Sequence, residues 1–178
     1  MSGTILLTTD RLVLRRHVPE DADFLYSHFG TDPRMYAYSG WNPYATPEMA
    51  RGTVQHFIDS YDDEDFYGWA TTLDGQMIGT VGAYDYDAGT GSIELGISID
   101  PEQWGKGFAS EALQRVLRYL TEERNISQVK AWCAADNLGS KKAMEKCGMQ
   151  LASVEAGALE IDGKTFDKLN YVYEKRSD

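Results

Sequence analysis

The sequence predicts a mixed α/β domain, of the α+β type, in which strands outnumber helices. Apolar and polar residues alternate over residues 92–99, which is typical of a half-buried strand. The period changes to that of an amphipathic helix over about residues 107–124. One face of this helix carries Ala109, Ala112, Leu113, Val116, Leu117 and Leu120. Two dipeptides, Asp74-Gly75 and Asp162-Gly163, indicate tight β-hairpin turns.

The other elements follow from shorter patterns. Strands are expected over residues 11–16, 66–73, 76–85, 92–99 and 129–134, and on both sides of Asp162-Gly163. Pro19 opens a helix over about residues 19–28, because proline suits the first helical position. Thr46-Pro47 opens the next helix for the same reason, with Thr46 as its cap. A short helix over residues 138–146 ends at Gly148.

The composition bounds the function. With 178 residues, 42% of them apolar, we expect one domain over residues 1–178. The formal net charge of −11 argues against nucleic acid as a partner and is compatible with a cationic substrate. We find no run of apolar residues that could span a membrane and no secretory signal, so we expect a cytoplasmic protein without a membrane partner. The two cysteines and three scattered histidines have no metal-ligand spacing, so no metal is expected.

The most specific local pattern is Gly105-Lys106-Gly107, between the strand at 92–99 and the long helix. The first N–H groups of a helix have no partner within the helix, and glycines let a ligand approach the backbone closely. The pattern therefore predicts an anion site suited to phosphate, although two glycines before a helix also form an ordinary turn. A P-loop is excluded because Gly107 follows Lys106 where Ser or Thr is needed. A dinucleotide-binding loop is excluded because the third glycine is missing.

Three segments together resemble the GNAT acetyltransferases. Residues 94–112 look like the acetyl-CoA signature of that family. Residues 137–149 and 9–15 resemble segments of its ribosomal-protein N-terminal acetyltransferases, the Rim group. The resemblance implies a mixed, mostly antiparallel twisted sheet of six to seven strands, splayed at the central cofactor-binding strands and flanked by about four helices. It also implies an acetyl-CoA-dependent N-acetyltransferase in which a primary amine attacks directly in a ternary complex.

The resemblance assigns the cofactor site residue by residue. Backbone N–H groups bind the pyrophosphate over the segment Trp104, Gly105, Lys106, Gly107, Phe108 and Ala109. Trp104 stands where many family members have Gln or Arg, which matters little for binding by the backbone. The strand holding Ile97 and Ile99 pairs with the pantetheine arm through its backbone, while both side chains belong to the core. Asn137 contacts the pantetheine or the sulfur region, and it is equally suited to be a helix N-cap.

Two residues are candidates for the chemistry. Glu94 is the candidate general base, because it lies on the polar face of the expected cofactor strand. The alternative is an exposed strand glutamate or a salt-bridge partner. Many GNAT enzymes use a tyrosine as general acid where this chain has Met144, a departure that the Rim group shares. Ser140 is therefore the candidate acid and a sulfur contact, with a first-turn serine bonded to the backbone as the alternative.

The acceptor is less readable. The aromatic segment around Tyr38 and Trp41 is expected to line the acceptor site, as the corresponding region does in the family, or else to be ordinary core. Protein or peptide N-termini and small amines all stay open as acceptors. A non-catalytic module that only senses acyl-CoA is the alternative function. A homodimer is the expected assembly.

Overall fold

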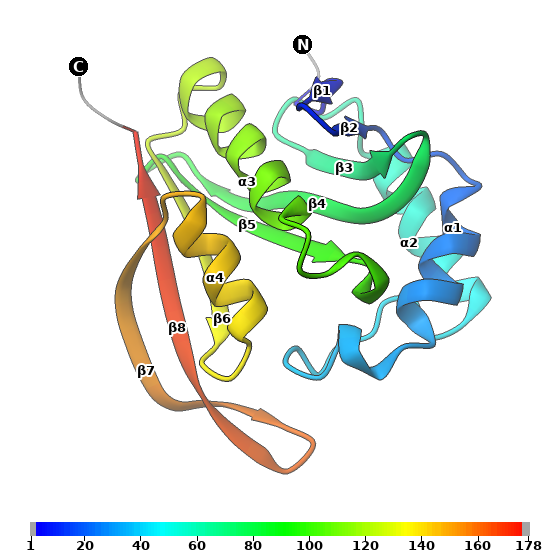
Figure 1. Cartoon of the computed structure of the whole chain (residues 1–178). Coiled ribbons are helices and arrows are strands. Elements are labelled where there is room, and N and C mark those ends of the chain that lie inside the picture. Colours follow the sequence, from blue (N-terminus) through cyan, green and yellow to red (C-terminus); the bar gives the residue numbers. More distant parts are fainter. Residues whose placement is uncertain (1–2, 176–178) are drawn as a thin grey trace.

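An eight-stranded sheet runs through the structure in the order β1-β2-β3-β4-β5-β6-β8-β7 (Figure 1). The structure is a computed structural model, and it describes residues 3–175. Neighbouring strands are antiparallel except β5 and β6, which are parallel. The strands are β1 (Leu7–Thr8), β2 (Leu12–Arg15), β3 (Tyr67–Leu73), β4 (Gln76–Asp87), β5 (Ser92–Ile99), β6 (Gln128–Ala134), β7 (Gln150–Ile161) and β8 (Lys164–Glu174).

Helices lie on both faces of this sheet. They are α1 (Asp21–Phe24), continued by η1 (Leu25–Gly30), the short η2 (Pro33–Met35), α2 (Pro47–Asp59), the short η3 (Pro101–Gln103), α3 (Phe108–Arg118), continued by η4 (Tyr119–Glu123), and α4 (Leu138–Lys146). The fold class expected from the sequence is confirmed. The sheet has one strand more than the six to seven expected, because β1 comprises two residues and is too short for an alternating pattern.

Two of the expected helices change their winding before they end. The Thr31 N–H donates to the Tyr26 carbonyl, and the Arg124 N–H donates to the Tyr119 carbonyl. Both bonds span five residues, so η1 and η4 are π-helical. The sequence signals for these two helices, Pro19 for the first and the apolar stripe for the second, do not distinguish a π-helical turn from an ordinary helix.

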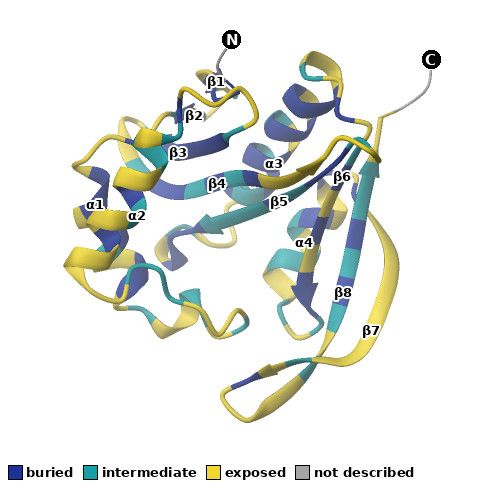
Figure 2. Ribbon diagram, turned by 180° about the vertical axis from the view of Figure 1, so that it is seen from behind, coloured by how far each residue is buried: buried dark blue, intermediate teal, exposed yellow. Residues whose placement is uncertain are grey.

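The helices bury two separate cores. α3 and α4 cover one face of the sheet, and α1 and α2 pack at the other (Figures 1 and 2). Leu113, Val116 and Leu117 of α3 belong to the large core, together with Trp69, Val81 and Leu95 of the strands. The smaller core joins α1, η1 and α2, with Met77 of β4 packed against it. In Figure 2 none of the described helices covers the near side of β6, β8 and β7. No helix within residues 3–175 is long and apolar enough to cross a membrane.

A buried carboxylate ties α1 to β2. Arg15 donates to both oxygens of Asp21, at 2.9 and 2.8 Å, and the Val18 N–H donates to one of them at 3.0 Å. Burial alone raises the pKa of the Asp21 carboxyl, but the hydrogen bonds from Arg15 and Val18, together with the His17 ring 3.2 Å away, outweigh burial and hold that pKa well below its usual range. The ionised carboxylate therefore stabilises the folded chain.

We expect Asp21→Asn to lower the free energy of unfolding at pH 7 by about 2 kcal/mol, because charge-assisted hydrogen bonds are lost. A carboxyl with a lowered folded pKa stabilises the protein above its unfolded pKa of about 3.9 and loses this effect as the pH falls toward the folded value. The difference in the free energy of unfolding between wild type and variant should thus be constant from pH 7 to about 5, and it should become smaller below about pH 4. Denaturant titrations at each pH measure it. Asp23→Asn, on the exposed side of the same helix, is the control. A difference that stays constant down to pH 3 would contradict the assignment.

Candidate active site

The central feature of the site is the separation of β5 from β6. Their pairing comprises Ser92 with Gln128, Ile93 with Val129, and Glu94 with Lys130, and it ends there. β5 continues to Ile99 along β4, and β6 continues along β8, so the two strands diverge (Figure 1). The expected splay is confirmed. Because β5 keeps only one neighbour beyond Glu94, its other edge offers free N–H and C=O groups to a ligand.

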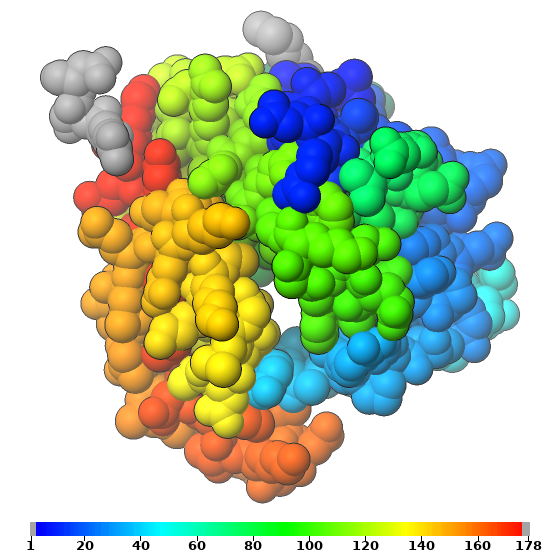
Figure 3. All heavy atoms as spheres, in the orientation of Figure 1, coloured from blue at the N-terminus to red at the C-terminus, as the bar shows by residue number. Residues whose placement is uncertain are grey.

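A hollow marks this divergence on the surface. Figure 3 shows an opening bounded by the segment around residues 100–108, by α4 and by the segment around residues 33–40. The side chains of β5 leave the backbone accessible at its free edge. Ile99 is buried in the core and Ile97 is half-buried against it, as expected. What β5 presents to the opening is thus its main chain.

The start of α3 follows directly from β5. Gly105 and Gly107 have φ angles of +78° and +83°, a region that glycine adopts at little cost. Gly107 is the residue that caps α3, so Phe108 and Ala109 stand in the first turn, where backbone N–H groups are free and the helix dipole is positive. The predicted anion site therefore has the expected backbone geometry, while Lys106 is exposed beside it.

Two further cations converge on Gly107, and sequence reasoning missed both. A Cβ at Gly107 would lie 3.5 Å from Arg11 Nη2 and 3.6 Å from Lys146 Nζ. Arg11 is fixed, because it pairs with Glu111 at 2.6 Å and its guanidinium lies 4.4 Å from the centre of the Phe108 ring. The only sequence signal for Arg11 was its place in the segment 9–15. The positive charge gathers here although the chain as a whole carries −11.

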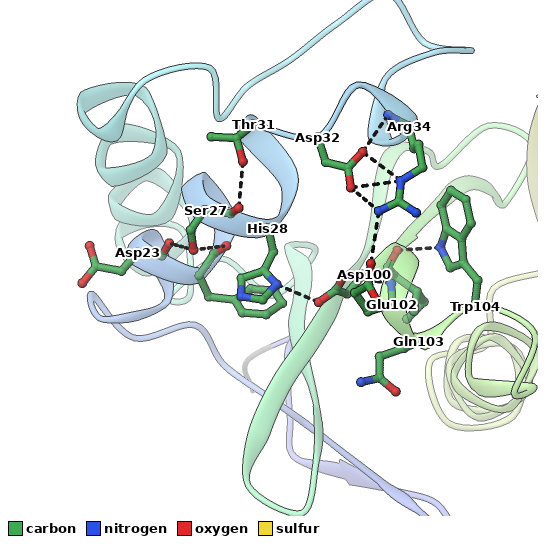
Figure 4. Close-up of polar contacts among 12 residues, drawn as sticks. Asp23, Ser27, His28, Thr31, Asp32, Arg34, Asp100, Glu102, Gln103 and Trp104 are labelled. Carbon is green, nitrogen blue, oxygen red and sulfur yellow. Dashed lines mark hydrogen bonds and ion pairs between the residues drawn. The ribbon is translucent and has the colours of Figure 1, made fainter.

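The loop between β5 and α3 is anchored to the α1 side of the molecule (Figure 4). Asp100 is buried; one carboxylate oxygen accepts from the Glu102 N–H at 3.1 Å, and the other lies 2.8 Å from His28 Nδ1. His28 stacks on Phe24, with ring centres 4.3 Å apart. The Trp104 indole N–H donates to the Ile99 carbonyl at 2.8 Å. The loop is thus fixed to η1 through Asp100 and to the end of β5 through Trp104.

A surface ion cluster repeats this connection nearer the solvent. Arg34 pairs with Asp32 at 2.6 Å and with Glu102 of the loop at 3.3 Å, and its guanidinium lies 5.9 Å from the Trp104 ring centre (Figure 4). Exposed ion pairs contribute little individually. Together with the buried Asp100, they place the segment 28–34 and the predicted phosphate loop in contact.

The start of α4 lies beyond the end of β6. Asn137 is its N-cap, since its side-chain oxygen accepts from the Ser140 N–H at 3.3 Å. The capping alternative is therefore confirmed, and it uses the oxygen of the amide. Within residues 3–175 no hydrogen bond of the Ser140 hydroxyl is found, so this group is available to a ligand. Met144, the residue that the resemblance aligns with a general-acid tyrosine, is buried in the core.

Glu94 occupies the point where β5 and β6 part. It is half-buried, and it stands on the sheet face opposite Ile93 and Leu95, which pack under α3. The Tyr84 hydroxyl of β4 donates to its carboxylate at 3.3 Å. Burial, and then the neighbouring Glu94 carboxylate, raise the pKa of Tyr84 to about 12, so the phenol is neutral at physiological pH. Sequence reasoning missed Tyr84, because its contact depends on the β4–β5 register.

Tyr38 and Trp41 are not brought together. Tyr38 packs edge-on against Phe166 of β8, with ring centres 5.6 Å apart, and lines a hollow of about 400 Å³ with Asp136 and Lys164. Trp41 is 66% exposed and lines a different hollow, of about 550 Å³, over α2. Of the two, only Tyr38 lies beside the segment that leads into α4.

Neither metal nor thiol chemistry has a built site in the described chain. Residues 3–175 contain no cluster of three or more His, Cys, Asp or Glu side chains that could hold a metal ion. Cys133 and Cys147 are both buried, and neither forms a disulfide. Burial raises the pKa of the Cys133 thiol to about 11, which keeps it protonated and a poor nucleophile at neutral pH.

Comparisons with known proteins agree with this geometry. The acetyltransferase (GNAT) domain family matches residues 11–150. The uncharacterized N-acetyltransferase YoaA of Bacillus subtilis (strain 168) is 29% identical over 164 residues, which cover 91% of this chain and 92% of that protein. RimL, a ribosomal L7/L12 alpha-N-protein acetyltransferase solved with coenzyme A, superposes with a TM-score of 0.84 at 18% identity, over 96% of this chain and 98% of RimL. The ribosomal-protein-S5-alanine acetyltransferase of Vibrio fischeri superposes with a TM-score of 0.82 at 18% identity, over 96% of this chain and 97% of that protein.

The structural neighbours thus include ribosomal-protein acetyltransferases, as the resemblance to the Rim group predicted, and at these identities they establish the fold alone. The family match spans more than half of the sequence and includes the splayed strand, the phosphate loop and the start of α4. This chain therefore belongs to the GNAT family of N-acetyltransferases.

Proposed function

We propose that this protein transfers the acetyl group of acetyl-CoA to a primary amine, by direct attack in a ternary complex. The observation that carries the proposal is the free edge of β5 beyond Glu94, which leads to the glycine-capped start of α3. RimL has been solved with coenzyme A, and a second neighbour, the microcin C7 self-immunity acetyltransferase MccE, with acetyl-CoA and AMP. These complexes support the same donor for this chain.

The donor is assigned to two backbone surfaces. N–H groups from Gly105 to Ala109 take the pyrophosphate, where the helix dipole favours negative charge, whereas the Trp104 N–H already donates to the Pro101 carbonyl at 3.2 Å and only borders the site. The free edge of β5 around Ile97 takes the amide groups of pantetheine as an additional strand would. Arg11 and Lys146 supply positive charge toward the phosphates. Asn137 retains its amide nitrogen for the pantetheine, since the cap uses its oxygen.

The chemistry needs a neutral amine and a stabilised oxyanion. The carboxylate of Glu94 accepts a proton from the amine, directly or through water. The nitrogen then attacks the thioester carbon, and a backbone N–H on the open edge of β5 stabilises the oxyanion. A C–N bond forms and the C–S bond breaks. As the tetrahedral intermediate collapses, the nitrogen loses its second proton to Ser140, directly or through water, while Ser140 gives its own proton to the leaving thiolate, and no covalent enzyme intermediate forms.

The acceptor side is assigned to the hollow beside Tyr38. Its wall includes Asp136, one residue before Asn137, so it lies next to the proposed sulfur region. Aromatic rings and carboxylates are suited to an ammonium group. Trp41 lines a separate hollow and is proposed only for more distant parts of an acceptor. The acceptor class is a primary amine, from a peptide or protein N-terminus to a small molecule.

Thiol release tests the function as a whole. With acetyl-CoA and a library of peptide N-termini, polyamines and aminoglycosides, we expect release that depends on the acceptor, measured with a thiol reagent. Binding of acetyl-CoA by calorimetry without acceptor-dependent release, across the library, would instead support a sensor of acyl-CoA.

Glu94→Gln should reduce kcat by about 100-fold, because the amine loses its base. The KM for acetyl-CoA should stay within about twofold, since uniform binding is retained. Steady-state kinetics at saturating acceptor measure both. Glu174→Gln, at the exposed end of β8, is the control. Full turnover of Glu94→Gln would remove Glu94 from the mechanism.

Ser140→Ala should slow thiol release in a single turnover by about tenfold, since a general acid is worth at least that much. The variant keeps the Ser140 N–H, so the α4 cap stays intact. Rapid-quench measurement of one turnover separates this step from product release. An unchanged single-turnover rate would eliminate Ser140 as the acid.

Gly107→Ala should raise the KM for acetyl-CoA by about tenfold, equivalent to about 1.4 kcal/mol, because any other residue is strained at φ +83°. The matched control is Gly75→Ala, in the turn between β3 and β4. Gly75 has φ +79° and no neighbouring atom within 4 Å of an added Cβ. Both variants should lose similar stability in thermal denaturation. If the two variants have equal KM values for acetyl-CoA, the loop around Gly107 does not take part in donor binding.

A further inference from the structure

The row of residues across β4 and β5 places Tyr84 beside the proposed reaction centre. Tyr84 stands directly opposite Glu94 in the antiparallel register, so the two side chains lie on the same face. The next row on that face is Gly68, Gly82 and Gly96, from three adjacent strands. Glycines leave this part of the sheet without side chains, directly beside the Tyr84–Glu94 pair.

The Tyr84 ring leans over this bare backbone. A Cβ at Gly96 would lie 3.5 Å from both the Cε1 atom and the hydroxyl oxygen of Tyr84. Gly96 belongs to the part of β5 that has left β6. The hydroxyl is therefore over the splayed strand, on the side that carries the Glu94 carboxylate.

The backbone next to Tyr84 is irregular. Between Tyr84 and Asp87 the register with β5 shifts, so three steps along β4 match two along β5. Asp85, inside this bulge, has a φ of +56°, which is unfavourable for a residue with a side chain. Bulges of this kind redirect side chains and recur beside active sites. The strain is located at the residue that follows Tyr84.

The hydrogen bond constrains the carboxylate. A free glutamate on a strand rotates about three side-chain bonds, and an exposed one has no fixed direction for its lone pairs. The Tyr84 hydroxyl engages Oε1, which leaves Oε2 to accept a proton. With its pKa raised to about 12, Tyr84 stays a donor throughout the physiological range.

We propose that Tyr84 is a positioning residue for acetyl transfer, whose hydroxyl fixes the Glu94 carboxylate so that its second oxygen meets the acceptor amine above Gly96. The inference rests on the proposed role of Glu94 as base. Tyr84 acts through Glu94, and it neither donates a proton to the thiolate nor binds acetyl-CoA.

A double-mutant cycle tests this role. Wild type, Tyr84→Phe, Glu94→Gln and the double variant are compared by kcat and by the KM for acetyl-CoA. Tyr84→Phe keeps the ring over Gly96 and removes only the hydroxyl. We expect it to lower kcat by about tenfold, the worth of one hydrogen bond to a charged group, with the KM for acetyl-CoA unchanged. In the Glu94→Gln background the same change should have no further effect. Tyr86→Phe, on the same strand but inside the bulge, should match wild type.

The outcomes separate this inference from the proposed function. If kcat falls in Glu94→Gln but not in Tyr84→Phe, the inference is overturned and the assignment of Glu94 as base stands. If Tyr84→Phe lowers kcat by the same factor in the wild type and in the Glu94→Gln variant, the inference is also overturned, because Tyr84 would then act independently of Glu94. Full turnover of Glu94→Gln would overturn both assignments. A shifted KM for acetyl-CoA or a lowered thermal midpoint, together with additive losses, would indicate a structural role instead.

Discussion

The structure depends on the point at which β5 and β6 stop pairing. A strand edge without a partner leaves polar backbone groups unsatisfied, which proteins rarely tolerate in a central position. Here each strand is held by its outer neighbour, β5 by β4 as far as Ile99 and β6 by β8 as far as Ala134. The gap is therefore rigid on both sides. Since α3 follows β5 and α4 follows β6, both helices begin at the open end of the gap. One break in the hydrogen-bond ladder thereby brings a free strand edge and two helix N-termini to one place.

The loop on the β5 side of this gap is tied to the N-terminal helices. The loop that leads into α3 is anchored through Asp100 to His28, which belongs to the π-helical continuation of α1. Asp21 in turn fixes α1 to β2 through Arg15. The chain that faces the proposed acceptor and the loop that faces the proposed donor thus share one set of buried polar contacts. A reaction between two bound substrates needs reacting atoms held within a few tenths of an ångström, and such contacts supply that precision.

Sequence patterns predicted the elements that are defined by neighbouring residues, and they missed the contacts that depend on how distant segments pack together. Alternation defined β5, and the glycines defined the start of α3, because both signals lie within a few residues. The sequence resemblance supplied the splay, which no local pattern contains. Tyr84 and Arg11 were not predicted as site residues, because each matters through a contact with a residue distant in the sequence. Tyr84 contacts Glu94, and Arg11 lies beside Gly107. Tyr38 and Trp41 are expected at one site because they share a short aromatic segment whose counterpart lines the acceptor site in the family. Side chains on an irregular segment have no fixed relative direction, and these two line different hollows.

The site divides its work between main chain and side chains. The groups assigned to the donor are mostly backbone N–H and C=O groups on β5 and at the start of α3, which any side chain leaves in place. The Trp104 side chain is accordingly free to serve the loop itself, with its indole N–H donating to the Ile99 carbonyl. The opposite face of the sheet is different, because there the side chains carry the proposed roles. Glu94 and Tyr84 present polar groups, and the row of Gly68, Gly82 and Gly96 leaves space beside them. Under the proposed roles, substitution there changes the acceptor side and leaves the donor groups in place. Relatives on one scaffold can therefore share a donor and differ in acceptor.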